Sequence, residues 1–290
     1  MGMLLAALLT ACGRDVSPPS SAAATNQQIF KVKGTIKELL PGGHKAVIAH
    51  ETITNYMDAM TMEFDVKDAR ELAGLATNDL VSFRMIVTDK DGWIDQVKKI
   101  GVNTNAPASG PAEMRRVREV EPLNVGDLMP PYHFTNEFGQ PFSLADFQGR
   151  ALAFTFIFTR CPYPTFCPRL SSNFSDAQNA LKARAGGPTN WHFLSITIDP
   201  EFDTPANLAA YAQKLTYDTN RWTFATGELI DITAIGEQFG LYFWKESGTI
   251  SHNVRTIVLD TKGRVHWTTK ENDWKPAVLV EEIVKAAAVK

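Results

Sequence analysis

Two near-continuous apolar runs, Ala151–Thr159 and Trp191–Ile198, restrict the fold of this chain more than any other feature. Strands that lose the usual apolar–polar alternation are buried on both faces, as in parallel sheets covered by helices. A helical stretch begins at Cys167-Pro168, between the two runs, and another begins at Thr204-Pro205 after them. Thr and Pro suit the first positions of a helix, so this half of the chain predicts a βαβ arrangement.

The rest of this half completes the pattern. A third helix is predicted to end at Phe239-Gly240, and Pro276–Ala288 is predicted to form a closing helix. Between them, Thr256–Asp260 and Arg264–Thr268 are predicted to form a hairpin around Lys262-Gly263. The predicted order is β-α-β-α-α-β-β-α, with parallel strands first and an antiparallel hairpin last, which is a thioredoxin-like α/β architecture.

In the N-terminal half, apolar residues recur with a different period, at every second position. Apolar residues alternate with polar ones in two clear segments, and Pro41-Gly-Gly43 and Asp91-Gly92 supply hairpin turns. We expect about five short strands, with one helical turn near Ala69–Leu75, closing into a small all-β barrel of the OB type. The alternating apolar positions are Phe30, Val32, Gly34 and Ile36 in the first segment and Val81, Phe83, Met85 and Val87 in the second.

Two stretches rich in Ser, Ala, Pro and Asn divide the chain. We predict a leader and flexible tether over residues 1–28, a β-barrel domain over 29–102, a linker over 103–120 and the thioredoxin-like domain over 121–290. The net charge of −3 indicates no polybasic surface for nucleic acid, and no apolar run reaches the roughly 18 residues that span a membrane.

Cys12 follows a short apolar run and Leu9-Thr10-Ala11, which resembles the lipobox of bacterial lipoproteins. The alternative is a simple apolar tail, because no Lys or Arg precedes the run as a signal peptide would require. The resemblance implies that residues 1–11 are removed and that Cys12 carries a lipid anchor. The protein would then face the periplasm or the outer side of a bacterial membrane, where thiols can oxidise.

Cys161 and Cys167 lie where the first apolar run meets a helix, in the spacing Cys-x5-Cys. Such a pair is either a redox couple, which closes a disulfide, or a soft-metal site. We expect Cys167 at the N-cap to have the lower pKa, because the helix N-terminus stabilises a thiolate, and Arg160 to add positive charge nearby.

His252 is the candidate third ligand, since its loop precedes a hairpin strand and reaches the cysteine end of the predicted sheet. Two thiolates and an imidazole suit copper as Cu(I) or Cu(II), and the same atoms could bind zinc. A loop histidine without a partner is the alternative. Lys245–Arg255 contains no proline, whereas related redox enzymes usually place a cis-proline opposite the thiols, and this favours metal binding.

Several ordered motifs make residues 121–290 resemble the Sco/SenC family of thioredoxin-fold copper proteins in cytochrome oxidase assembly. The resemblance implies that Cys161, Cys167 and His252 bind copper, with Asp199 close by as a supporting or partner-contact group. The family's usual spacing is Cys-x-x-x-Cys, so this chain carries two extra residues. The matching segments are Thr159-Arg-Cys161-Pro, Phe166-Cys167-Pro168, Ser195–Pro205, Phe239-Gly240 and Ser251-His252 before Val258-Leu-Asp260.

A second soft donor set lies in the predicted barrel, where His50 precedes Met60, Met62 and Phe64. The methionines could be ordinary core residues, but thioethers with an imidazole also prefer Cu(I). The segment resembles CusF-like periplasmic copper-binding domains, which implies His50, Met60 and Met62 as ligands. The family's capping Trp is missing here; Met57 could be a further thioether ligand, or Tyr56 a substitute cap through a cation–π contact.

These features together predict a lipid-anchored copper metallochaperone with two copper sites. The partner would be an apo-cuproprotein such as a cytochrome oxidase copper subunit. The main alternative is an enzyme, a thiol–disulfide oxidoreductase that reduces a partner's copper-ligand cysteines, with Cys167 attacking and Cys161 resolving. A weaker alternative is a copper-buffering protein. His44, His133, His192 and His266 are expected to be structural or surface residues.

Overall fold

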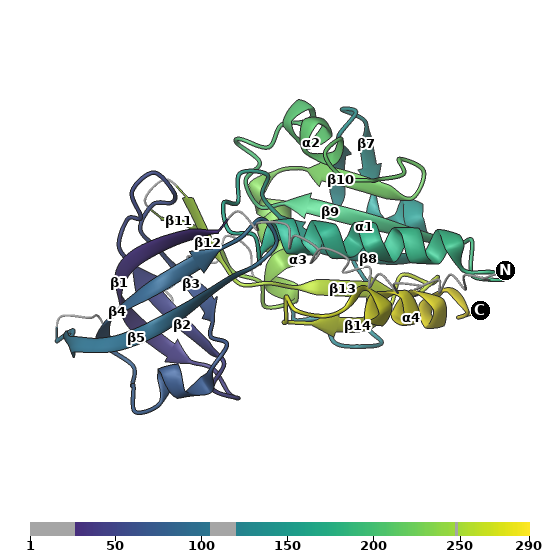
Figure 1. Ribbon diagram of the computed structural model, residues 1–290. Helices are drawn as coiled ribbons and strands as arrows, with labels where there is room; N and C mark the ends of the chain where they lie inside the picture. The colour runs from purple at the N-terminus through teal and green to yellow at the C-terminus, as the bar shows by residue number, and fades with distance from the viewer. Residues whose placement is uncertain (1–26, 105–119, 247–248) are drawn as a thin grey trace, which may run out of the picture.

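The computed structural model describes residues 27–104, 120–246 and 249–290, which form a five-stranded domain and a seven-stranded domain (Figure 1). The predicted lipid attachment residue Cys12, nearly all of the tether and most of the linker lie outside these ranges. Within the described ranges, none of the helices combines the length and apolar character needed to cross a membrane.

The N-terminal domain is an antiparallel sheet in the order β3-β2-β1-β4-β5. An isolated β-bridge between Val66, just after β3, and Ile94 of β5 brings the two edge strands of this sheet together, as a small barrel requires. The single helical turn, Ala69–Leu72, begins after Asp68, whose side chain accepts a hydrogen bond from the Arg70 N–H. The strands are β1 Gln28–Leu39, β2 Lys45–His50, β3 Met60–Asp65, β4 Asp79–Val87 and β5 Gly92–Val102.

Strict alternation explains this barrel. In β2 and β3 every second residue is buried, so the side chains of Phe64, Ile48 and Ala46 pack inside while their neighbours face outward. The small all-β domain predicted from the period-two pattern is confirmed.

The C-terminal domain is a mixed sheet in the order β14-β13-β8-β9-β10-β6-β7. Strands β8, β9 and β10 are parallel, while β13 and β14 form the antiparallel hairpin expected near the end of the chain. The strands are β6 His133–Asn136, β7 Pro141–Ser143, β8 Ala151–Ile157, β9 Trp191–Thr197, β10 Trp222–Thr226, β13 Thr256–Leu259 and β14 Val265–Thr269; the helices are α1 Cys167–Ala183, α2 Pro205–Ala212, α3 Leu229–Gln238 and α4 Pro276–Ala287.

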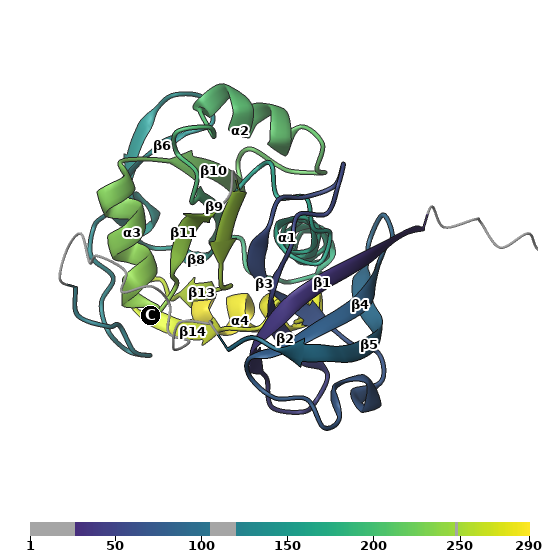
Figure 2. The same cartoon turned by 90° about the vertical axis from the view of Figure 1, so that its left-hand side faces the viewer.

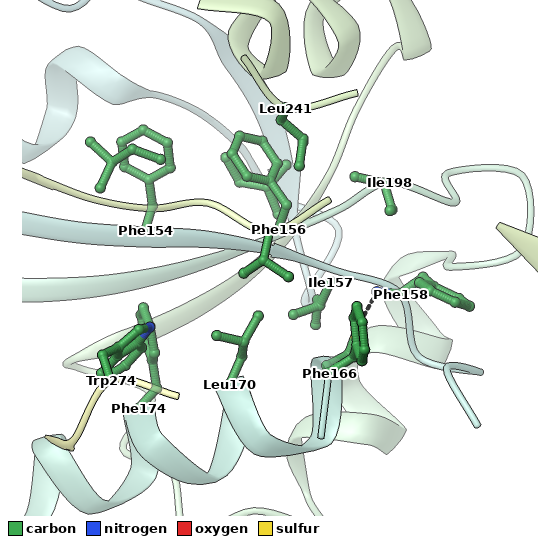
Figure 3. Close-up of a cluster of buried hydrophobic side chains, with 14 of the residues drawn as sticks. Phe154, Phe156, Ile157, Phe158, Phe166, Leu170, Phe174, Ile198, Leu241 and Trp274 are labelled. Atoms are coloured by element: carbon green, nitrogen blue, oxygen red, sulfur yellow. Dashed lines mark hydrogen bonds between the residues drawn. The ribbon is translucent and has the colours of Figure 1, made fainter. Parts of the chain in front are cut away.

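The sheet is covered on both faces. Helices α1 and α4 lie on one face and α3 on the other (Figure 2). Phe154 and Phe156 of β8 point to the side of Leu241, whereas Leu170 and Phe174 of α1 pack beneath the same strand (Figure 3). All seven residues of β8 and all seven of β9 are buried, which accounts for their lack of alternation. The predicted thioredoxin-like fold is confirmed.

The predicted order of elements lacked strand β10, which separates α2 from α3. Trp222, Phe224 and Ala225 of this strand are fully buried, but its five residues are too few to show a clear period. The prediction also lacked the short β6–β7 hairpin and a separate hairpin formed by β11 (Phe243–Glu246) and β12 (Thr249–His252).

The two domains pack against each other through the β11–β12 hairpin, which projects from the main sheet toward the barrel (Figure 1). The N–H of Thr61 in β3 donates to the hydroxyl of Ser251 in β12 at 3.3 Å. The Tyr56 hydroxyl donates to the carbonyl of Pro162 at 3.1 Å, and Arg169 pairs with Asp91 at 2.8 Å. Three contacts from separate elements therefore fix the docked arrangement.

Candidate metal site

The two cysteines lie on either side of the loop between β8 and α1. Cys167 is the first residue of α1, and Phe166 occupies the N-cap position, so the prediction of Cys167 as the N-cap is wrong. Cys167 is fully buried, whereas Cys161 is half-buried, and both are free thiols. The Phe158 N–H donates to Cys167 Sγ at 3.5 Å, so the end of β8 also anchors this thiol.

The expected order of the two thiol pKa values was wrong. A hydrogen bond from the Cys167 thiol, helped by His252, lowers the pKa of Cys161 to about 5. Burial raises the pKa of Cys167 well above its usual value, and the neighbouring Cys161 thiolate raises it further. The helix N-terminus does not compensate for this desolvation, because Cys167 has no contact with water.

Arg160 does not act on the thiols as expected, because its charge is paired elsewhere. Its Nε lies 2.7 Å from the carboxylate of Asp199, and its guanidinium stacks over the Phe202 ring at 4.7 Å. Asp199 is almost completely buried. Its observed role is to hold the residue that precedes Cys161.

His252, at the end of β12, presents one defined nitrogen to the thiols. Its Nδ1 lies 2.8 Å from the carbonyl of Asn253, and a carbonyl can only accept, so Nδ1 carries the proton. In the neutral ring Nε2 then carries the lone pair, and it lies 3.9 Å from Cys167 Sγ. Metal–sulfur and metal–nitrogen bonds of about 2.3 and 2.0 Å put two ligands of one ion roughly 4 Å apart.

The methionines of the barrel lie on the other side of the space next to Cys161 and His252. Met60 and Met62 occupy alternate, buried positions of β3, and Met57 lies in the preceding turn, where it pairs with Ile53. Together they line a cavity that also contains Cys161 and His252. The cavity lining is completed by Phe158, Pro162, Tyr163, Phe166 and Ile250.

His50 stands beside the methionines without lining the cavity. It is opposite Met60 in the β2–β3 register and is buried. Its Nδ1 lies 2.7 Å from the Glu51 carbonyl, so its Nε2 carries the lone pair, as in His252. Tyr56 also lies outside the lining: its ring stacks on Phe30 at 4.6 Å.

Three side chains at the site were missed by the sequence analysis. Phe158 and Phe166 place their ring edges against His252 at 5.6 and 5.9 Å, and Tyr163 is buried between the cysteines and the barrel. Two of them, Tyr163 and Phe166, lie in the segment between Cys161 and Cys167, and their aromatic character was the available signal.

The donor chemistry fits a soft cation. Among the described residues, no three His, Cys, Asp or Glu side chains form a group that could hold a metal ion by themselves. Cys161, Cys167 and His252 therefore do not make up such a group on their own, although His252 Nε2 lies 3.9 Å from Cys167 Sγ. The thioethers that line the cavity are the neighbouring soft donors. Sulfur and imidazole together select Cu(I) over hard cations.

The fold and donor set define a thioredoxin-like domain with a soft-metal centre. The family model for SCO1/SenC matches residues 120–288, and this chain belongs to that family. The model for the copper binding periplasmic protein CusF matches residues 29–99. Both resemblances drawn from sequence are confirmed.

Individual relatives are more distant. A SCO1 protein homolog of Bacillus subtilis (strain 168) is 33% identical over 107 residues, which cover 37% of this chain and 52% of that protein. The chain thus matches about half the length of this curated relative.

Two solved structures are similar in fold. A SCO1/SenC family lipoprotein from Bacillus anthracis str. Ames aligns with a TM-score of 0.50 and 29% identity, over 56% of this chain and 95% of that one. BsSco, described as a member of the Sco family of cytochrome c oxidase assembly proteins with a disulfide switch, aligns with a TM-score of 0.50 and 25% identity, over 60% and 100%.

Proposed function

We propose that this protein is a copper metallochaperone that binds Cu(I) at Cys161, Cys167 and His252. It delivers the ion to an apo-cuproprotein in cytochrome c oxidase assembly, from a lipid anchor at Cys12 on the outer face of a bacterial membrane. The observation that carries the proposal is the position of His252. Its Nε2 lies 3.9 Å from Cys167 Sγ, and its ring lines a cavity together with Cys161 and three methionines.

Delivery and thiol redox state are coupled in this function. A thiolate is a copper ligand, whereas a disulfide sulfur is not, so only the reduced protein can be loaded. Both cysteines are free thiols here. The half-buried Cys161 is the ligand that an incoming partner could reach first.

The test is transfer of copper to a soluble oxidase fragment that carries the apo copper site. Anaerobic Cu(I)-loaded protein should load this fragment faster than a free Cu(I) chelate does, and His252→Ala should abolish the advantage. His133→Ala is the matched control, because His133 is exposed and lies in β6, which β9 and β10 separate from β8. If the loaded protein transfers copper to the fragment no faster than the chelate does, the chaperone role is excluded and copper buffering is the function that remains.

An oxidoreductase role has one observation in its favour, the lowered pKa of the partly exposed Cys161. Cys161 would then attack the partner's disulfide and the buried Cys167 would resolve, the reverse of the roles expected from sequence. Two thiols of this protein would become one disulfide while the partner's disulfide became two thiols. Copper-free reduced protein that reduces an oxidised oxidase fragment, while loaded protein transfers no copper, would establish this alternative.

A further inference from the structure

We propose that the two domains build one mixed copper pocket, in which Cu(I) is shared between the thioethers of the barrel and the thiolate and imidazole of the thioredoxin-like domain. The ion passes from one donor set to the other by ligand replacement, without entering water. This inference rests on the proposed function and replaces the two independent sites expected from sequence.

The shape of the pocket supports a single ion. Met57, Met60 and Met62 from the barrel and Cys161 and His252 from the other domain line the same cavity. Its volume is about 20 Å³, and a cavity needs roughly 10–15 Å³ to admit one water molecule. There is room for one ion, and two separately coordinated ions do not fit.

Neighbouring strands hold the two donor sets in register. Thr61, which lies between the two β3 methionines, donates its N–H to Ser251, which directly precedes His252. Successive residues of a strand point to opposite sides, so the methionines share one side of β3. The contact therefore ties the backbone of the strand that carries the thioethers to the side chain of the residue before His252.

The long Cys-x5-Cys loop has a structural use in this arrangement. Tyr163, the second of its five residues, is buried and packs its ring against Phe64 of the barrel core at a centroid distance of 6.0 Å. A Cβ atom added at Gly92, the first residue of β5, would lie 2.8 Å from Tyr163 Oη. The two residues beyond the family's usual spacing lengthen the loop that carries this side chain into the barrel.

The pocket is suited to Cu(I) held by the thiolate of Cys161, the cysteine that lines it. None of the residues that line it is Lys, Arg, Asp or Glu, so a bound cation is not balanced by a fixed charge. A thiolate neutralises Cu(I), and thioethers and imidazole add neutral donors, so the complex is stable in an apolar setting. Copper stays Cu(I) throughout, no electron moves, and the proton lost by each ligating thiol goes to water.

The test uses the full chain grown with selenomethionine and loaded with one equivalent of Cu(I) without oxygen. X-ray absorption at the copper edge separates selenium of methionine from sulfur of cysteine and nitrogen of histidine. We expect selenium together with sulfur or nitrogen around the same one equivalent of copper. Met57→Leu/Met60→Leu/Met62→Leu should remove the selenium signal, and these changes nearly conserve side-chain volume, so folding is retained.

Gly92→Ala tests whether docking is what creates the shared site. The methyl group collides with Tyr163 at the interface, so the domains should separate. Selenium and sulfur or nitrogen should then no longer surround the same copper ion, and the chain should bind two copper ions. Release of one equivalent of copper to bathocuproine disulfonate should be roughly 10-fold faster or more. Gly101→Ala in the same strand is the matched control, because its nearest neighbour, Leu80, lies 3.9 Å away.

The outcomes separate this inference from the proposed function. Copper surrounded by sulfur and nitrogen without selenium, in both the wild type and Gly92→Ala, would overturn the shared pocket and leave the chaperone site intact. Copper surrounded by selenium and unaffected by Cys161→Ser would overturn both. If Gly92→Ala fails to fold, the selenium signal of the wild type and its loss in the triple leucine variant still decide whether the methionines bind the same copper ion.

Discussion

At the scale of single residues, the two candidate histidine ligands are set up in the same way. His50 and His252 each direct Nδ1 at the carbonyl of the next residue, at 2.7 and 2.8 Å. This contact places the proton on Nδ1 in both neutral rings and fixes the ring orientation before any ion arrives. Strands β2 and β12 end at these two residues, so local backbone geometry orients both candidate ligands.

His192 illustrates the opposite use of a histidine. It is buried in β9, its Nε2 lies 2.9 Å from the Thr223 hydroxyl, and its ring packs on Phe147 at 4.7 Å. Burial lowers its pKa to about 3. The expectation that it is a structural residue agrees with these contacts.

His192→Gln should therefore change the pH dependence of stability. Between pH 6.5 and 3 only the unfolded chain protonates this residue, so the wild type loses stability as the pH falls and the variant does not. From pH 7 to pH 5 the wild type should lose ~2 kcal/mol relative to the variant. Urea denaturation at both pH values measures this difference, and parallel losses would contradict it. His133→Gln controls for loss of an exposed imidazole.

At the scale of elements, Asp203 joins the ends of two strands to the start of a helix. Its carboxylate accepts the Thr159 N–H at 3.0 Å, the Thr159 hydroxyl, and the Thr197 hydroxyl at 2.5 Å. Thr159 follows β8, Thr197 ends β9 and Thr204 caps α2. In the sequence, Asp203 stands out only as part of a family motif, since its partners are 6 and 44 residues away.

Asp203→Ala should destabilise the protein by about 3 kcal/mol, because it leaves buried donors without an acceptor. Asp176→Ala, which removes an exposed carboxylate from α1, should change the unfolding free energy by less than about 0.5 kcal/mol. Chemical denaturation of the three proteins at pH 7 makes the comparison. Equal stabilities would show that the network contributes nothing.

At the scale of the whole molecule, docking joins two domains, one from each of two protein families, into one unit. Besides the packing of Tyr163 against Phe64, Lys45 of the barrel contacts Asn272 and Glu271 of the other domain. Arg169 pairs with Asp91. The Arg169–Asp91 pair is partly exposed, so it is worth at most about 1 kcal/mol. Apolar and backbone contacts therefore supply the remaining stabilisation of the docked state.

Removing this ion pair should partly open the pocket. Arg169→Gln and Asp91→Asn should each raise the rate of Cys161 alkylation by iodoacetamide about 2- to 5-fold, equivalent to 0.5–1 kcal/mol. The double variant should add nothing further, and salt should weaken the effect. Mass spectrometry of the Cys161 peptide gives the rates. Additive effects in the double variant would show that the two side chains act independently.

Much of this molecule could be predicted from sequence, because the signals are local. Buried runs around α1 predict parallel strands, alternation in β2 and β3 predicts the barrel, and sulfur and imidazole predict a soft metal. Strand β10 was missed because five residues carry too little periodicity. The order of the thiol pKa values was wrong because burial of Cys167 depends on residues distant in sequence.

The sequence by itself determined the two folds and the candidate donor residues. Only the tertiary structure decided that Met60 and His252, 192 positions apart in the numbering, face one cavity. Local patterns record which side of a strand is buried, but they do not record which domain covers it. That choice depends on contacts such as Tyr163 against Phe64 and Thr61 with Ser251, which exist only once both domains have folded.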